Sequence, residues 1–93
     1  MVQETALSER GKDWVAFSAK VLAHIEEYTV PQYGDKGEDL ATTCNSDQFL
    51  HSIRRYAARH GSNARQEQDL LDLLKIAHYS HLAFDKESEL KNV

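Results

Sequence analysis

The sequence predicts an all-α protein with three main helices, at about 13–29, 46–60 and 63–84. Apolar residues recur at helical spacing in each stretch, and no stretch shows the alternation typical of a strand. The first two stretches also end next to residues that interrupt helices, Pro31 and Gly61. A helical bundle satisfies these observations, and the breadth of the third apolar face predicts that the bundle is dimeric.

The first helix is amphipathic. Asp13 is a plausible N-cap, and Pro31 disfavours helical geometry at Val30, so the helix should end there. One face of the helix carries most of its large apolar side chains, namely Trp14, Val21, Leu22, Ile25 and Tyr28. Because Trp14 lies on that face, it is expected in the core rather than as a platform for stacking bases.

The longest connection spans residues 30–45. Gly34 and Gly37 flank Asp35, which indicates a turn. Asp35 and Glu38 have the spacing of a capping box, so a short helical turn is predicted near 36–43. A connection of this length in a small domain is often functional.

The middle helix has clear signals at both ends. Asn45 or Ser46 can cap its start, with Gln48 near the third position. Gly61 suits a left-handed residue after its last turn. The short junction to the third helix predicts an antiparallel helix pair. Tyr56 lies on the apolar stripe of this helix, so it too is expected in the core.

The third helix has the widest apolar arc, about 240° at 100° per residue. Its centre is formed by Leu70, Leu73, Leu74, Ala77, His81 and Phe84. The remaining polar strip carries Asp69, Asp72, Lys75 and Tyr79. A helix packed on one side needs only about 100° of apolar surface. A homodimer is therefore predicted, with an interface at Leu71, Leu74, His78, His81 and Leu82.

Length and composition are those of one soluble domain. The 93 residues form a single domain, with polar tails at 1–12 and 85–93 that are expected to fray. The net charge of −4 argues against broad nucleic-acid binding. The single cysteine, Cys44, excludes an intramolecular disulfide and a cysteine-based zinc site. Since no signal peptide or membrane-spanning run is found, a cytoplasmic location without membrane association is expected.

Acidic residues at helical spacing are candidates for a metal site. Asp69 and Asp72 are three residues apart, and Asp35 and Glu38 repeat the spacing in the long connection. Carboxylates grouped in this way can hold Mg²⁺, which acts on phosphates. The alternative is a solvated helix face and a turn with its cap, supported by the local ion-pair spacing of Asp72 and Lys75.

Basic residues gather in the middle helix of this acidic protein. The segment from His51 to Gln66 contains no acidic residue. Its arginines Arg54, Arg55 and Arg59 are candidates for phosphate binding, because one guanidinium group can donate two parallel hydrogen bonds to a phosphate. The alternative is that they match the helix dipole and keep the surface soluble.

Two histidines lie three residues apart on the apolar side of the third helix. His78 and His81 could begin a transition-metal site, but the sequence fixes no third ligand. Hydrogen-bonded core or interface histidines are the simpler reading. At a buried interface the pair would make assembly sensitive to pH near 6.

Three segments in order resemble the MazG-like all-α nucleotide pyrophosphohydrolases, especially small phage-associated domains linked to nucleotide modification. They are QYGD (32–35), IRRYAAR (53–59) and DLLDLLKIAHY (69–79), which together with their spacing span about half of the chain. The resemblance implies a helical nucleotide-binding domain. It implies Mg²⁺ held by Asp69 and Asp72 with Asp35 and Glu38, and phosphates neutralised by the three arginines.

The sequence departs from that family in the middle helix, which offers Arg, Ser, Ala and His where magnesium-binding Glu pairs are expected. The resemblance therefore implies nucleotide or phosphate binding more directly than hydrolysis. The competing hypothesis is a non-enzymatic homodimeric interaction module. A histidine-based metal binder is the third.

Overall fold

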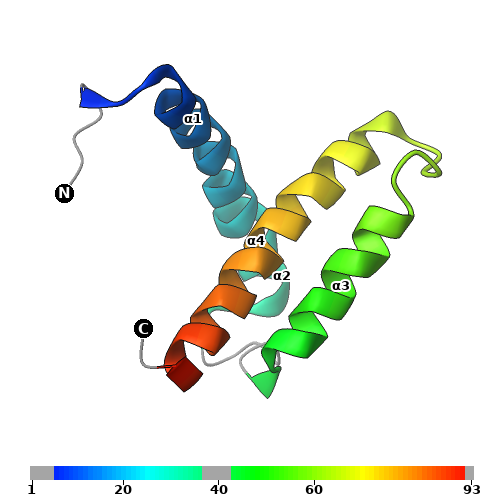
Figure 1. Cartoon of the computed structure of the whole chain (residues 1–93). Coiled ribbons are helices and arrows are strands. Elements are labelled where there is room, and N and C mark those ends of the chain that lie inside the picture. Colours follow the sequence, from blue (N-terminus) through cyan, green and yellow to red (C-terminus); the bar gives the residue numbers. More distant parts are fainter. Residues whose placement is uncertain (1–5, 37–42, 92–93) are drawn as a thin grey trace.

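The computed structural model describes residues 6–36 and 43–91, and these residues contain helices and no strand, as predicted. Residues 9–33 form one continuous helical rod, which we call the first rod and which consists of three consecutive segments (Figure 1). In chain order the elements are α1 (Glu9–His24), the π-helical segment η2 (Ile25–Thr29), α2 (Val30–Tyr33), α3 (Ser46–Ala58) and α4 (Gln66–Lys91). The three predicted helices thus correspond to the first rod, α3 and α4.

The first rod begins earlier than predicted. Its N-cap is Ser8 and not Asp13, because the Ser8 hydroxyl accepts a hydrogen bond of 3.1 Å from the backbone N–H of Gly11. Glu9 then lies in the first turn, where its charge matches the helix dipole. Lys12 pairs with Glu9 at 3.5 Å. Part of the polar segment 1–12 is therefore helical.

The rod also continues past Val30, where Pro31 was expected to end it. A proline inside an α-helix removes one hydrogen bond, and its ring crowds the carbonyl four residues earlier. Here the wider π-helical turn of η2 precedes it, and the N–H of Val30 bonds to the carbonyl of Ile25, five residues back. Pro31 thus occupies the first turn of a new α-helical segment, where a proline is tolerated. The rod ends at Gly34, whose φ of 93° favours glycine.

Helices α3 and α4 form the predicted antiparallel pair and lie side by side (Figure 1). The predicted capping box is present. The Asn45 side chain accepts from the N–H of Gln48 at 2.9 Å, and the Gln48 side chain accepts from the N–H of Asn45 at 2.7 Å. Gly61 has a φ of 84°, so the connection turns at the glycine that the sequence singled out.

Helix α4 starts three residues later than predicted and runs to Lys91, so residues 85–91 are not a frayed tail. The contacts of Glu87 explain why the helix extends through these residues. Its carboxylate accepts a hydrogen bond from the Ser46 hydroxyl at the start of α3 and pairs with Lys91 at 3.3 Å. The hydrogen bond from Ser46 attaches the last turns of α4 to the beginning of α3, and the pair with Lys91 lies within α4.

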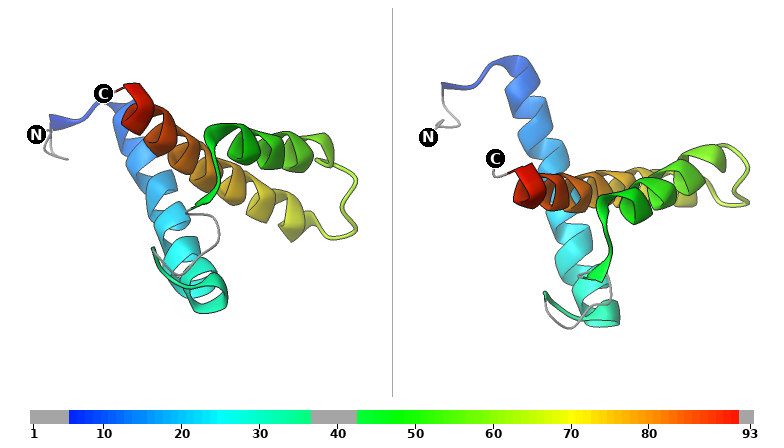
Figure 2. Two further views of the ribbon diagram at one scale, coloured as in Figure 1. Left: turned by 90° about the horizontal axis from the view of Figure 1, so that it is seen from below. Right: turned by 60° about the horizontal axis from the view of Figure 1, so that its bottom comes forward.

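The first rod crosses α4, and the N-terminal part of α1 extends beyond the crossing (Figure 2). The core of the described residues is small. Its buried apolar side chains are Phe49, 3% exposed, and Ala83, 7% exposed. Phe49 lies against Tyr79, with ring centroids 6.0 Å apart.

The burial of several α4 residues differs from the prediction. Asp72, expected on a solvated strip, is 1% exposed and lies on the side that meets α3. Leu70 and Phe84, expected near the centre of the buried face, are 64% and 66% exposed. Periodicity shows which residues share a face of the helix, but it does not show that polar side chains of the α3–α4 turn provide partners for a buried carboxylate.

Some predictions fall outside the described residues. The predicted helical turn near 36–43 lies almost entirely in the segment 37–42, which also contains Glu38. The ends of the two predicted tails, at 1–5 and 92–93, also lie outside the described residues. None of the helices in the described ranges combines the length and the apolar character needed to cross a membrane.

Candidate functional site

A cavity of about 310 Å³ lies between the η2–α2 segment and the α3–α4 pair. All four tyrosines of the chain line it, although they come from three separate parts of the sequence. We call this cavity the tyrosine groove and define it by six side chains, Tyr28, Tyr33, Tyr56, Tyr79, Arg55 and Lys75. Its volume is at the lower end of the range typical of small-ligand sites.

Cations gather around the ring of Tyr56. The guanidinium carbon of Arg55 lies 5.3 Å from the ring centroid, and that of Arg59 lies 4.9 Å from it. The Lys75 ammonium reaches the same ring from α4 at 5.4 Å. These distances fall within the range of cation–π attraction. Tyr56 therefore brings two cations of the groove together despite their mutual repulsion.

The other rings of the groove are stacked. The Tyr56 and Tyr79 rings are 5.9 Å apart at 20°, and His24 stacks on Tyr28 at 5.3 Å and 17°. Burial and the neighbouring Tyr56 raise the pKa of Tyr79 to about 12, so its phenol stays protonated at neutral pH. Burial and the Lys75 charge lower the pKa of His24, so its imidazole is mainly neutral at pH 7.

No aspartate or glutamate is among the described residues that line the tyrosine groove. The chain as a whole carries a net charge of −4, so the groove is a local reversal of sign. An arginine and a lysine beside aromatic faces provide donors for an anionic group and surfaces for a planar ring. A ligand that combines both features suits this chemistry.

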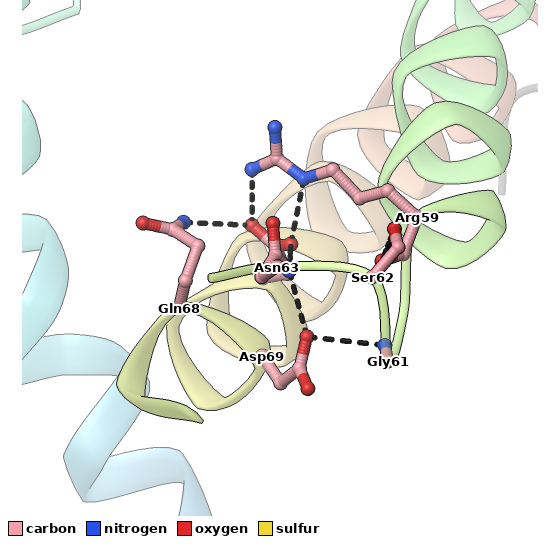
Figure 3. Close-up of polar contacts among 7 residues, drawn as sticks. Arg59, Gly61, Ser62, Asn63, Gln68 and Asp69 are labelled. Carbon is pink, nitrogen blue, oxygen red and sulfur yellow. Dashed lines mark hydrogen bonds and ion pairs between the residues drawn. The ribbon is translucent and has the colours of Figure 1, made fainter. Parts of the chain in front are cut away.

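The predicted acidic pair lies elsewhere, at the turn between α3 and α4 (Figure 3). Asp72 accepts two hydrogen bonds from the Arg59 guanidinium, 2.8 Å from Nε and 2.6 Å from Nη2. The side-chain amides of Gln68 and Asn63 donate two more, at 3.0 and 3.2 Å. Arg59 and the two amides hold the pKa of Asp72 well below its usual range, despite burial. We call this group the Asp72 clamp.

Asp69 also stabilises the turn between α3 and α4. Its Oδ1 accepts from the Asn63 amide at 2.6 Å and from the backbone N–H of Gly61 at 3.3 Å (Figure 3). These two bonds, that from Asn63 first, lower the pKa of Asp69. The predicted local pairing of Asp72 with Lys75 is replaced by the longer-range pairing with Arg59. Both oxygens of Asp72 thus accept N–H groups, so this carboxylate fits an internal clamp rather than an open metal site.

The rest of the predicted magnesium site is not assembled around this pair. Asp35 lines a second cavity of about 300 Å³ with His81 and Asp85, and Glu38 lies outside the described residues. Within 6–36 and 43–91, no three His, Cys, Asp or Glu side chains are grouped so that they could hold a metal ion. The magnesium site stays a prediction.

The histidine pair has a different environment from the expected one. The His78 and His81 rings are 6.3 Å apart. His81 is an exposed partner of Asp85, at 3.0 Å, rather than a core residue. His78 is partly buried and lines both cavities.

The three predicted phosphate-binding arginines separate in the structure. Arg55 lines the tyrosine groove, Arg59 is committed to Asp72, and Arg54 is exposed and lines neither cavity. Lys75 and the four tyrosines were not predicted as site residues. The sequence held a signal in Tyr56 and Tyr79, since each lies near a basic residue, but Tyr56 was assigned to the core and Tyr79 to the polar strip.

The predicted dimer residues lie mainly on the side of α4 that faces the first rod. His78 and Leu82 line both cavities against η2. Leu71 and Leu74 continue this side by helical spacing toward the start of α4, and Leu71 is 38% exposed. His81 lies farther round the helix.

Comparisons with protein-family models, with curated proteins and with solved structures find no match to this chain. The geometry of the groove and of the helix surfaces therefore carries the functional argument.

Proposed function

We propose that this all-α protein is a domain of MazG-like character that binds a nucleotide in the tyrosine groove. The observation that carries this function is the meeting of Arg55 and Lys75 at the ring of Tyr56, at 5.3 and 5.4 Å. The phosphates would bind the two cations, and the base would stack on the tyrosine rings.

We assign binding alone to the groove. Metal-assisted hydrolysis needs carboxylates or a metal-activated water near the phosphates. No carboxylate is among the described residues of the groove, and Asp72 is occupied by its clamp. Binding without turnover is the function that these contacts support.

Calorimetry of the full chain tests this function. Nucleoside triphosphates are titrated with and without Mg²⁺, and inorganic triphosphate is titrated in parallel. We expect heat from the nucleotides and weaker binding of inorganic triphosphate, which lacks a ring to stack. Arg55→Gln and Lys75→Gln should each weaken nucleotide binding by about tenfold, the effect of losing one charge-assisted contact.

Arg54→Gln is the matched control, because Arg54 is the neighbouring arginine and lies outside the groove. Its affinity should equal that of the unaltered protein. If none of the nucleotides produced a heat of binding, the binding proposal would be wrong. Equal losses in the Arg54 and Arg55 variants would move the site away from the groove.

A second function is favoured by the size of the uncovered surface: we propose that the chain is a homodimeric interaction module. Its accessible surface is 7418 Å², whereas a folded monomer of 93 residues exposes about 5,500 Å². Its radius of gyration is 14.9 Å, against about 12 Å for a compact chain of this length. The roughly 1,900 Å² of additional surface exceeds the about 800 Å² that each partner buries in a standard interface.

Light scattering after size exclusion tests the homodimer. The mass should be twice the 10.6 kDa of one chain. Leu74→Asp should lower it toward the monomer, because a carboxylate would enter the apolar side of α4. Leu90→Asp is the control, since Leu90 is 79% exposed near the far end of α4. A monomeric mass for the unaltered protein would refute the homodimer.

A further inference from the structure

The N-terminal half of α1 presents an apolar stripe that this chain does not cover. Trp14 is 62% exposed, and its ring lies 5.6 Å from that of Phe17. By helical spacing the two residues share a face with Val21 and Ile25, and Ile25 lines a cavity against α4. The stripe is therefore the continuation of the face that α1 and η2 place against α4, extended beyond the crossing (Figure 2).

The matching side of α4 is also open beyond the crossing. His78 and Leu82 lie opposite η2, and Leu71 and Leu74 continue that side toward the start of α4. The two helices diverge there (Figure 1). The same two apolar faces that meet at the crossing thus run on without a partner in this chain.

We propose that the N-terminal half of α1 pairs antiparallel with α1 of a second copy of this chain, between the diverging arms of α1 and α4. This inference rests on the proposed homodimer and adds the surface that forms it. It commits to a second copy because the charges beside the stripe complement themselves across a two-fold axis.

Trp14, Phe17 and Val21 follow the alternating three- and four-residue spacing of a coiled-coil seam. In an antiparallel pair of such helices, each residue at an a position of the seam packs against a residue at a d position of the other helix. A two-fold axis between Val15 and Ala16 places Trp14 against Phe17 of the second copy, and the reverse contact follows by symmetry.

Asp13 and Lys20 lie seven residues apart on the same flank of the seam and carry opposite charges. Both are exposed, and neither forms an ion pair within the described part of the chain. In the antiparallel pair, Asp13 of each copy lies near Lys20 of the other. The symmetric dimer thus gains two ion pairs, and a parallel pair would not form them.

Charge exchange tests this arrangement in the full-length protein. The dissociation constant of the dimer is measured by sedimentation for Asp13→Lys, for Lys20→Asp and for the double variant. Each single change places like charges together twice and should raise the dissociation constant by about tenfold. The double variant exchanges both signs and should restore it to within about threefold.

Glu26→Lys is the matched control, because it makes the same change of charge on η2, which continues α1 away from the seam, and it should leave the dissociation constant unchanged. Trp14 is the only tryptophan of the chain and reports directly on the stripe. Its emission should shift to longer wavelength as dilution separates the dimer.

The outcomes separate the two levels of the proposal. If the unaltered protein is monomeric, the homodimer and the pairing of α1 both fail. If it is dimeric but the double variant fails to recover, or if the emission does not change on dilution, the antiparallel pairing is wrong and the homodimer stands. Recovery in the double variant together with the emission shift supports the pairing.

Discussion

Arg59 and Asp72, thirteen positions apart in the chain, join the end of α3 to the second turn of α4 through two hydrogen bonds of 2.8 and 2.6 Å. The Asp72 side chain is nearly inaccessible, whereas the Arg59 side chain remains 40% exposed. The carboxylate is thus the buried partner, and the hydrogen bonds of the Asp72 clamp replace those that water would donate to it. The turn between the helices is held by the same residues that resembled a metal site in the sequence.

The first prediction concerns the stability of this pair. Asp72→Asn should lower the free energy of unfolding by about 2 kcal/mol, because the paired bonds to Arg59 lose their charge and the guanidinium loses a buried counter-ion. The partial exposure of Arg59 keeps the loss below that of a fully buried pair. Urea denaturation at a fixed chain concentration measures the change.

Asp85→Asn is the control for this substitution. Asp85 lies on the same helix, but its side chain is 43% exposed and its partner is His81. The loss should stay below about 0.5 kcal/mol, as expected for an exposed pair. Equal losses in the two variants would contradict the clamp as a buried interaction.

The second prediction concerns acid unfolding. The folded-state pKa of Asp72 lies below its ordinary value of 3.8, chiefly because of the hydrogen bonds from Arg59. A carboxylate with a depressed pKa contributes stability above the ordinary pKa, and this contribution is lost as the pH falls through the folded-state pKa. The unaltered protein should therefore lose stability steeply below pH 3.8.

In Asp72→Asn the group no longer titrates, so the slope of unfolding free energy against pH should be smaller below pH 3.8. Above that pH the two slopes should agree, which separates this effect from the uniform loss described above. Parallel curves across the acid range would mean that Asp72 does not carry the acid sensitivity. Circular dichroism at graded urea concentrations provides the curves.

The sequence predicted the number and order of the helices because their signals are local. The capping box of Asn45 and Gln48 and the turn at Gly61 were both recognisable in short segments. The end of the first rod was not, because the effect of Pro31 depends on the π-helical turn before it. That turn has no distinct signature in the sequence.

The candidate site was predictable only in part, since it depends on contacts between distant segments. Arg55 was identified from the basic composition of its helix. Lys75 was assigned to a polar strip expected to face water, although the structure places it beside Tyr56. Asp72 was misplaced for the same reason: helical spacing shows which residues share a face, but not which face the neighbouring helix covers.

The third prediction concerns the end of α4, which the sequence left as a tail. The Ser46 hydroxyl, and after it Lys91, lower the pKa of Glu87, so this carboxylate is charged at neutral pH. Glu87→Ala should remove both contacts and loosen residues 85–91, because the hydrogen bond from Ser46 joins these residues to the start of α3. Amide hydrogen exchange in those residues should become faster, with little change elsewhere in α4.

Glu89→Ala is the matched control for the end of the helix. Glu89 is exposed two residues further along and forms no hydrogen bond or ion pair through its side chain with the described residues. Exchange in 85–91 should then remain close to that of the unaltered protein. Fast exchange in both variants, or in the unaltered protein itself, would show that the contact of Glu87 with Ser46 does not hold these turns.

The last prediction concerns salt and the tyrosine groove. Arg55 is exposed and Lys75 is partly exposed, so their attraction for an anionic ligand is screened by ions. Raising the salt concentration from about 0.1 M to about 1 M shortens the screening length from about 10 Å to about 3 Å. Nucleotide affinity measured by calorimetry should fall by about tenfold over this range.

The variants separate the groove from the rest of the surface. In Arg55→Gln the decrease with salt should be smaller, because one of the two screened contacts is already absent. In Arg54→Gln it should match that of the unaltered protein, since this arginine lies outside the groove. An affinity that does not depend on salt would mean that stacking on the tyrosines carries the binding, and that Arg55 and Lys75 do not contact the phosphates.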